Sequence, residues 1–240
     1  MLNGISTMEE RKEEHITGGE KIRSVLLGLN DGLISTFTLL VGVAAATLAS
    51  SGSILVILTG IAAMVSGAIS MGLGEYVSSK SEYNYIKNEI KKEKAEISLF
   101  PEEEKAEVRI IFNNMGFDGD TLDACVEKIT SNEEIWLNFL IKSELGLEEP
   151  ENPIIGAILT FFSFILGAFI PLFPYFLDLN LVSLILSSVF SFGSLFIVGI
   201  LKTKITGESW IKGSLEMLLV GAVAFVASYS IGLVLEQIIP

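Results

Sequence analysis

The chain has 240 residues, half of them hydrophobic, and carries a net charge of −13 at pH 7. Soluble domains average below its mean hydropathy of +0.57, so the composition indicates a membrane protein. The acidic surplus favours cations as partners and argues against nucleic acid, because phosphate binding requires clustered Lys and Arg. Cys125 is the single cysteine, which excludes an intramolecular disulfide and fits a reducing compartment.

Residues 1–22 are polar and are expected to form a short cytosolic tail. Residues 9–14 are all charged and no apolar stretch accompanies them, so a cleavable signal peptide is not expected. His15, the only histidine, lies in this tail, where a lone histidine is usually solvated, and we assign it no role.

Five stretches are long enough to span a bilayer, which needs about 20 apolar residues. They are apolar around the whole helix circumference, which argues against five buried helices of a soluble protein. They occupy residues 25–50, 54–78, 154–175, 179–201 and 211–238. The predicted fold is an all-α membrane protein with five transmembrane helices, the first two in 23–79 and the last three in 152–240. Between them lies a cytosolic helical module, residues 80–151, here called the acidic module.

The distribution of Lys and Arg predicts the orientation of these helices. Basic residues precede the first span, occur throughout the acidic module and recur at Lys202, Lys204 and Lys212, whereas loops 50–53 and 176–180 have none. Cytosolic segments carry the excess of basic residues. The N-terminus and the acidic module are therefore expected in the cytosol and the C-terminus outside.

Two residues within the spans bear on function. Asp31 lies about two turns inside the first span, where an ionisable side chain either faces a cavity or snorkels to water; chemistry alone leaves both open. Met71 in the second span is, from its chemistry alone, best interpreted as a side chain that fills space between helices. If it is a ligand, its thioether sulfur would suit a transition metal. Small residues at Ser66, Ser70 and Gly74 form a stripe typical of a helix-packing or dimer seam.

The acidic module contains 18 Asp and Glu against 9 Lys and Arg. Its helical patterns cover residues 79–97, 101–113, 118–129 and 132–146, and the first continues the second span without a break. A loop is expected at residues 98–101. Asp118-Gly119-Asp120 is not interpreted as a calcium loop, because the 12-residue ligand series ending in Glu is absent.

Two Glu-x-x-Glu pairs, Glu93/Glu96 and Glu104/Glu107, follow one another in this module. The spacing puts both carboxylates of a pair on one helix face, and two such helices facing each other make an oxygen-rich metal cage. From the residues alone, a metal cage and an ordinary solvated acidic face are equally good interpretations. The absence of a Glu-x-x-His pattern argues against a ferritin-type oxidase site.

The chain resembles the vacuolar iron transporter family over nearly its whole length. The resemblance is carried by Leu29-Asn-Asp-Gly-Leu33, by Ser70-Met-Gly-Leu-Gly-Glu-Tyr-Val77, and by Trp136-Leu-Asn-Phe139 with Glu144-Leu-Gly-Leu-Glu148-Glu-Pro150. Five spans with a module between the second and third also match that family's layout.

The resemblance implies a homodimer, joined through the first two spans, that exchanges cytosolic Fe²⁺, and often Mn²⁺, for protons. It implies no enzymatic step and no prosthetic group. It places the ion pathway at Asp31 and Met71. It assigns metal capture to glutamates of the acidic module, namely Glu93, Glu96, Glu104, Glu107 and Glu144.

This sequence departs from the plant-type pattern at two places. Ala63 stands where those members carry a further Glu, and the nearest carboxylate is Glu75, which becomes a weaker candidate for proton coupling. Leu140 and Ile141 stand in place of a Met pair. The acidic module would then hold metal through oxygen alone, a set that also admits Mn²⁺, Zn²⁺ or Ca²⁺.

The expected function is proton-coupled export of Fe²⁺ from the cytosol, across the cell membrane of a prokaryote or a vacuole-like membrane of a eukaryote. A manganese-selective exporter is the alternative within transporters. Outside that class, a membrane-anchored iron buffer or oxidase and a purely structural membrane protein remain open. Asp31 inside a span argues against a mere anchor.

Overall fold

The computed structural model describes residues 19–51, 53–147 and 151–238, and within these ranges its regular structure is entirely helical. The elements are α1 (Gly19–Ser51), α2 (Ser53–Leu99), α3 (Pro101–Asn114), α4 (Gly119–Thr130), α5 (Glu133–Ser143), α6 (Pro153–Leu172), the 3₁₀ helix η1 (Phe173–Leu177), α7 (Leu181–Thr206) and α8 (Trp210–Ile238). Five helices, α1, α2, α6 with η1, α7 and α8, are long and apolar enough to cross a membrane. The predicted all-helical fold and its five candidate membrane-spanning helices are confirmed within the described residues. His15 and residues 148–150 of the third motif lie outside the described ranges.

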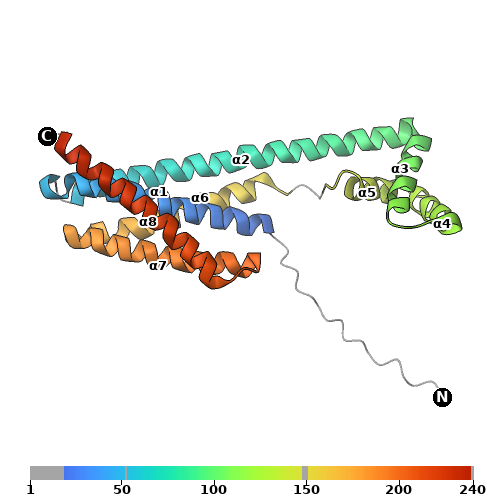
Figure 1. Cartoon of the computed structure of the whole chain (residues 1–240). Helices are drawn as coiled ribbons and strands as arrows, with labels where there is room; N and C mark the ends of the chain where they lie inside the picture. The colour runs from blue at the N-terminus through green and yellow to red at the C-terminus, as the bar shows by residue number, and fades with distance from the viewer. Residues whose placement is uncertain (1–18, 52, 148–150, 239–240) are drawn as a thin grey trace, which may run out of the picture. The chain divides into compact units, whose positions relative to one another are not determined.

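Helix α2 continues from the apolar second span into charged sequence without interruption, as predicted. It is the longest helix in Figure 1, and the short helices α3, α4 and α5 gather at its C-terminal end. The loop expected at 98–101 is shorter than predicted, because only Phe100 separates α2 from α3. Pro101 opens α3 and disfavours helical backbone at the preceding residue, and Phe100 accordingly has φ −131°.

The chain forms two compact units. The first contains the chain up to Val65 and from Phe162 onward, and the second is Ser66–Phe161. In the first unit α1 packs against α7 and α8, and α7 against α8. Its largest core cluster gathers apolar side chains around Tyr175, namely Phe37, Leu40, Val41, Ala44, Val56, Leu172 and Leu184. A smaller cluster joins Leu33 to Leu195, Val198 and Met217.

Glycines let helix backbones of the first unit touch directly. A Cβ at Gly32 of α1 would collide with the carbonyl oxygen of Phe164 in α6, and one at Gly167 of α6 would collide with that of Leu29. Such close approach through small residues is how helices associate in lipid, where apolar side chains gain little by leaving one another. The predicted stripe at Ser66, Ser70 and Gly74 is, in contrast, exposed in the single chain.

Several helix boundaries differ from the prediction. Helix α1 begins at Gly19 rather than residue 25, because Lys21 and Arg23 are compatible with a helical turn beyond the apolar span. The third span, expected at residues 154–175, divides into α6, which ends at Leu172, and η1. Pro171 lies in the last turn of α6, and its carbonyl accepts a hydrogen bond from the Ser187 hydroxyl at 2.7 Å. Helix α7 begins at Leu181 rather than residue 179, after left-handed backbone at Asp178 and Asn180, residue types that tolerate it.

The second unit has its own apolar core under the acidic surface. Buried residues from α2 to α5 form it: Ile97, Val108, Leu122, Val126, Trp136 and Leu140. Helix α5 is capped by Asn132, whose side-chain oxygen accepts hydrogen bonds from the backbone N–H groups of Glu134 and Ile135 at 2.9 and 3.1 Å. Asp118 occupies the N-cap position of α4 without a side-chain capping bond.

Because the backbones meet at Gly32, we predict that Gly32→Ala destabilises the folded chain by about 1–3 kcal/mol, the usual cost of overpacking. Gly193→Ala in α7 is the matched control, since a Cβ there meets nothing within 4 Å and removing a helical glycine stabilises by up to about 1 kcal/mol. Thermal unfolding of the purified chain in detergent measures both. Equal melting temperatures for the two variants would refute the close α1–α6 contact.

Candidate metal centre

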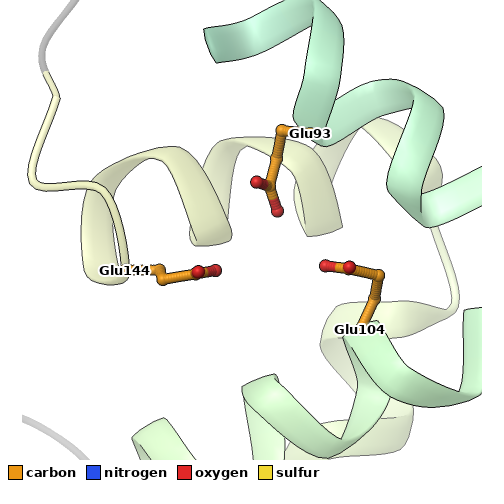
Figure 2. A group of neighbouring side chains, drawn as sticks. All are labelled: Glu93, Glu104 and Glu144. Atoms are coloured by element: carbon orange, nitrogen blue, oxygen red, sulfur yellow. The ribbon is translucent and has the colours of Figure 1, made fainter. Parts of the chain in front are cut away.

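Three carboxylates of the second unit converge from three helices. Glu93 lies in the last turns of α2, Glu104 in the first turn of α3, and Glu144 at the C-terminal cap of α5. One oxygen from each lies within 4.8 Å of the others. Figure 2 shows the three side chains pointing toward a common centre. This spacing is suited to a single cation bridging all three carboxylates.

Local sequence explains why these side chains meet. The single-residue turn at Phe100 folds α3 back so that Glu104 comes close to Glu93. The apolar core places the end of α5 beside them through Trp136 and Leu140. Beyond Glu144 the chain reverses at Gly146, whose φ of 61° is left-handed and favours glycine. The cluster is therefore held by the fold of the unit.

Two of the three carboxylates are buried with oxygen atoms left unsatisfied. Glu93 is 4% and Glu104 6% exposed. Among the described residues, Glu93 Oε1 and Glu104 Oε2 are buried without a hydrogen-bond partner. A buried carboxylate is strongly destabilising unless it is paired, protonated or bound to a metal. A divalent cation would satisfy both oxygens at once.

The electrostatics of the cluster favour either protons or a cation. Burial raises the pKa of Glu93 to about 7, and the charges of Glu144 and Glu104 add to the effect. Burial likewise raises the pKa of Glu144 to about 7, with further contributions from Glu107, which shares a hydrogen bond with it. The pKa of Glu104 is raised for the same first reason. Without metal, the cluster therefore retains protons near neutral pH.

The remaining two predicted ligands surround this trio. Glu107 is half-buried and Glu96 is exposed, and the charges of both raise the pKa of Glu93, Glu104 and Glu144. The structure thus brings together one member of each Glu-x-x-Glu pair with Glu144, and places the second members close enough to add negative potential.

The donor set consists of carboxylate oxygen. Leu140 and Ile141, which stand where a Met pair was expected from the resemblance, are 0% and 8% exposed. Leu140 belongs to the apolar core and offers no donor atom. Oxygen-rich sites suit Mn²⁺, Mg²⁺, Ca²⁺ and Fe²⁺ better than soft ions.

Comparison with known proteins then decides the family. The VIT family model matches residues 22–233 of this chain. The chain belongs to the VIT family. Vacuolar iron transporter 1 of Arabidopsis thaliana is 35% identical over 233 residues, covering 96% of this chain and 92% of that protein. Vacuolar iron transporter 1 of Tulipa gesneriana is 32% identical over 96% of this chain and 94% of its own length. The vacuolar iron transporter of Plasmodium falciparum is 29% identical, over 96% and 88% respectively.

The membrane candidates of this VIT-family chain lie in different units and are described separately. Asp31 is half-buried in α1, where its backbone carbonyl accepts a hydrogen bond from the Ser35 hydroxyl at 2.5 Å. Met71 and Glu75 are both half-buried in α2. No described interaction assigns any of the three to a metal site, and their roles remain predictions.

Sequence reasoning missed two polar residues on α1. Asn30 Oδ1 and Thr36 Oγ1 are buried and find no hydrogen-bond partner within the described part of the chain. Unsatisfied polar atoms in an apolar helix are costly and mark places where an ion, water or partner is expected. The signal was available, since Asn30 is a polar residue beside Asp31 inside a span.

We predict that Glu93→Gln weakens Mn²⁺ binding by more than about tenfold. Mutating a residue that only hydrogen-bonds to a metal ligand already lowers metal affinity about 10–100-fold, and Glu93 is expected to bind the metal directly. Glu127→Gln on the exposed surface of α4 is the control and should leave binding unchanged. Isothermal titration with each detergent-purified variant measures the affinities. Equal affinities would remove Glu93 from the metal site.

We also predict that the metal-free protein loses stability as pH rises from about 4.5 to about 7. The folded pKa of Glu93 and Glu144 is about 7 against 4.5 for an ordinary glutamate, so the folded state binds more protons in this window. Stability then falls with rising pH. Millimolar Mn²⁺ should suppress that fall by replacing the protons. Thermal melts across this range, with chelator or with Mn²⁺, test it, and a metal-free melt that rises with pH would contradict it.

Proposed function

We propose that this chain transports divalent metal, Fe²⁺ first, out of the cytosol in exchange for protons. The observation that carries the proposal is the three-glutamate cluster, in which two carboxylates are buried, in a chain with five helices suited to crossing a membrane. Its similarity to proteins named vacuolar iron transporters supports Fe²⁺ as the substrate.

The acidic module performs the capture step in this proposal. Glu93, Glu104 and Glu144 supply ligand oxygens, and Glu96 and Glu107 raise the local concentration of cations through their charge. Binding of the metal releases the protons held by the raised pKa values. The cluster thereby exchanges protons for metal without any covalent step, so no enzyme activity is assigned.

The step across the membrane is assigned to Asp31 and Met71. Asp31 supplies charge and Met71 a soft contact suited to Fe²⁺. Glu75 is the carboxylate offered for proton movement, since Ala63 has none. The unsatisfied oxygen of Asn30 adds a polar group to the same stretch of α1.

A homodimer with a cytosolic N-terminus and acidic module completes the proposal. The exposed small residues Ser66, Ser70 and Gly74 of α2 suit close packing against a helix of a second copy. The basic residues that flank the spans on one side favour a cytosolic location for that side. The membrane is the cell membrane in a prokaryote or a vacuole-like membrane in a eukaryote.

Manganese is the second candidate substrate. The observation that favours it is the oxygen donor set, with Leu140 and Ile141 buried in place of sulfur. Carboxylates suit Mn²⁺ at least as well as Fe²⁺. Competition between the two ions in the transport assay separates an iron transporter from a manganese-selective one.

We predict that vesicles containing the wild-type chain accumulate Fe²⁺ when an opposing proton gradient is imposed, and that Asp31→Asn reduces uptake to background. The substitution keeps the side chain's shape and removes its charge, which the passing cation requires. Asp178→Asn is the matched control, because Asp178 lies after η1 in left-handed backbone that Asn also tolerates.

Iron bound by the acidic module with no flux in the wild type would support a membrane-anchored buffer instead. Neither binding nor flux would support a structural membrane protein. Equal uptake by Asp31→Asn and Asp178→Asn would remove Asp31 from the pathway while leaving transport itself established.

A further inference from the structure

A pocket of about 370 Å³ lies within the second unit, between α2 and the start of α6. Its lining consists of Tyr76, Lys80 and Tyr83 from α2 and of Asn152, Pro153 and Ile154 from the beginning of α6. None of these residues belongs to the glutamate cluster. The volume lies in the range of small-molecule sites, and the lining combines one cation with two phenols and an amide.

The pocket sits where both helices pass from apolar to polar sequence. Helices α2 and α6 pack closely at Gly72, where an added Cβ would lie 3.1 Å from Phe161 and 3.4 Å from the Ala157 carbonyl. Tyr76, Lys80 and Tyr83 follow about one to three turns further along α2, and together with Asn152, Pro153 and Ile154 at the start of α6 they line the pocket. The apolar run of α2 ends there and that of α6 begins there. In a bilayer that covers these apolar runs, the pocket would lie at the level of the lipid headgroups, where Tyr is enriched.

Lys80 is the charged residue among those that line this pocket, and Lys87 lies two turns further along α2; Glu75, Glu82 and Glu151 are sequence neighbours of the lining. The Lys80 and Lys87 ammonium groups lie 4.8 and 4.6 Å from the centre of the Tyr83 ring. Within the described part of the chain, neither lysine has a carboxylate at ion-pair distance. A hydrogen bond from Lys87, and the charges of both lysines, lower the pKa of the Tyr83 phenol. The Lys80 ammonium thus gives the pocket wall a cationic donor with which an anion can pair.

The start of α6 contributes geometry rather than charge. Pro153 has no N–H, the Asn152 side-chain oxygen accepts a hydrogen bond from the Ile154 N–H at 3.1 Å, and the Asn152 carbonyl accepts one from Ile155. The first N–H groups of this helix are therefore already occupied. The Lys80 ammonium, the two phenol hydroxyls and the Asn152 amide remain as donors for a ligand.

Exposed apolar side chains continue from the pocket toward the membrane. Leu73 and Val77 on α2 are 60% and 61% exposed, and Ile154 and Ile158 on α6 are 53% and 51% exposed. A phosphate held by Lys80 would leave acyl chains to run along this surface. A free phosphate would gain nothing from it.

We propose that this pocket binds the phosphate group of an anionic phospholipid in the leaflet next to the acidic module. Lys80 provides the ion pair, Tyr76, Tyr83 and Asn152 provide hydrogen bonds, and Lys87 reinforces the positive potential through Tyr83. The inference does not rest on metal transport, because none of its residues is assigned to the ion.

Native mass spectrometry of the full chain in neutral detergent tests the proposal, with phosphatidylglycerol and phosphatidylcholine of identical acyl chains as probes. Wild type should retain phosphatidylglycerol preferentially. Lys80→Ala should weaken that binding about fivefold, the effect of about 1 kcal/mol for one lysine near an anionic surface, and Lys80→Arg should restore it. Lys91→Ala, an exposed lysine on the same helix outside the pocket, is the matched control.

Equal retention of the two lipids by the wild type would overturn the proposal without reference to any variant. Equal loss in Lys80→Ala and Lys91→Ala would overturn it too, because the effect would then be general charge. Millimolar inorganic phosphate could also displace bound phosphatidylglycerol and appear as phosphate adducts instead. That result would assign the pocket to free phosphate and overturn the proposal that it binds a lipid. A melting temperature in detergent equal to that of the wild type shows that each variant is folded.

Discussion

In the acidic module, Glu93, Glu104 and Glu144 are close together and partly buried, and both conditions make their ionised forms unfavourable. An apolar core and two backbone reversals bring these carboxylates together, and two of them are withdrawn from water. Three negative charges at this distance cannot all remain ionised without a counter-charge. Protons and divalent cations are the two counter-charges available, and the raised pKa values mean that one displaces the other near neutral pH. The chemistry proposed for the chain follows from that competition, and the surrounding helices serve to maintain it.

The helices of the first unit are held together in another way. In lipid, contact between apolar side chains of two helices gains little free energy over contact with the acyl chains. These helices instead approach through Gly32 and Gly167, where backbone meets backbone. This packing leaves long apolar faces exposed on α8 and leaves Asn30 and Thr36 buried with unsatisfied oxygens on α1. Exposed faces suit lipid or a second copy of the chain, and the unsatisfied oxygens lie on the helix that carries Asp31. Close packing and polar atoms thus occur on the same element.

Sequence was sufficient for the features that depend on local pattern. Apolar length predicted the five spans, and the lack of a break after Gly74 predicted that α2 continues as one helix. The glutamate cluster was predicted only in part. Spacing predicts Glu93 beside Glu96 and Glu104 beside Glu107 on their own helix faces, whereas the structure joins Glu93 and Glu104 to Glu144 across three helices. That grouping depends on tertiary packing and on the turn at Phe100, which no periodicity encodes. Glu144 was identified through the family resemblance, and the left-handed residues at Asp178 and Asn180 had no apolar pattern to mark them.

The burial of Leu140 and Ile141 also affects how the cluster withstands damage. Reduced iron in the presence of peroxide generates oxidants at the place where it is bound, and thioether ligands are then converted to sulfoxides. A carboxylate has no comparable oxidation, and Leu140 and Ile141, four and three residues before Glu144, carry buried hydrocarbon. In the proposed capture step, a donor set made of oxygen alone would therefore load repeatedly under oxidative stress without needing enzymatic repair.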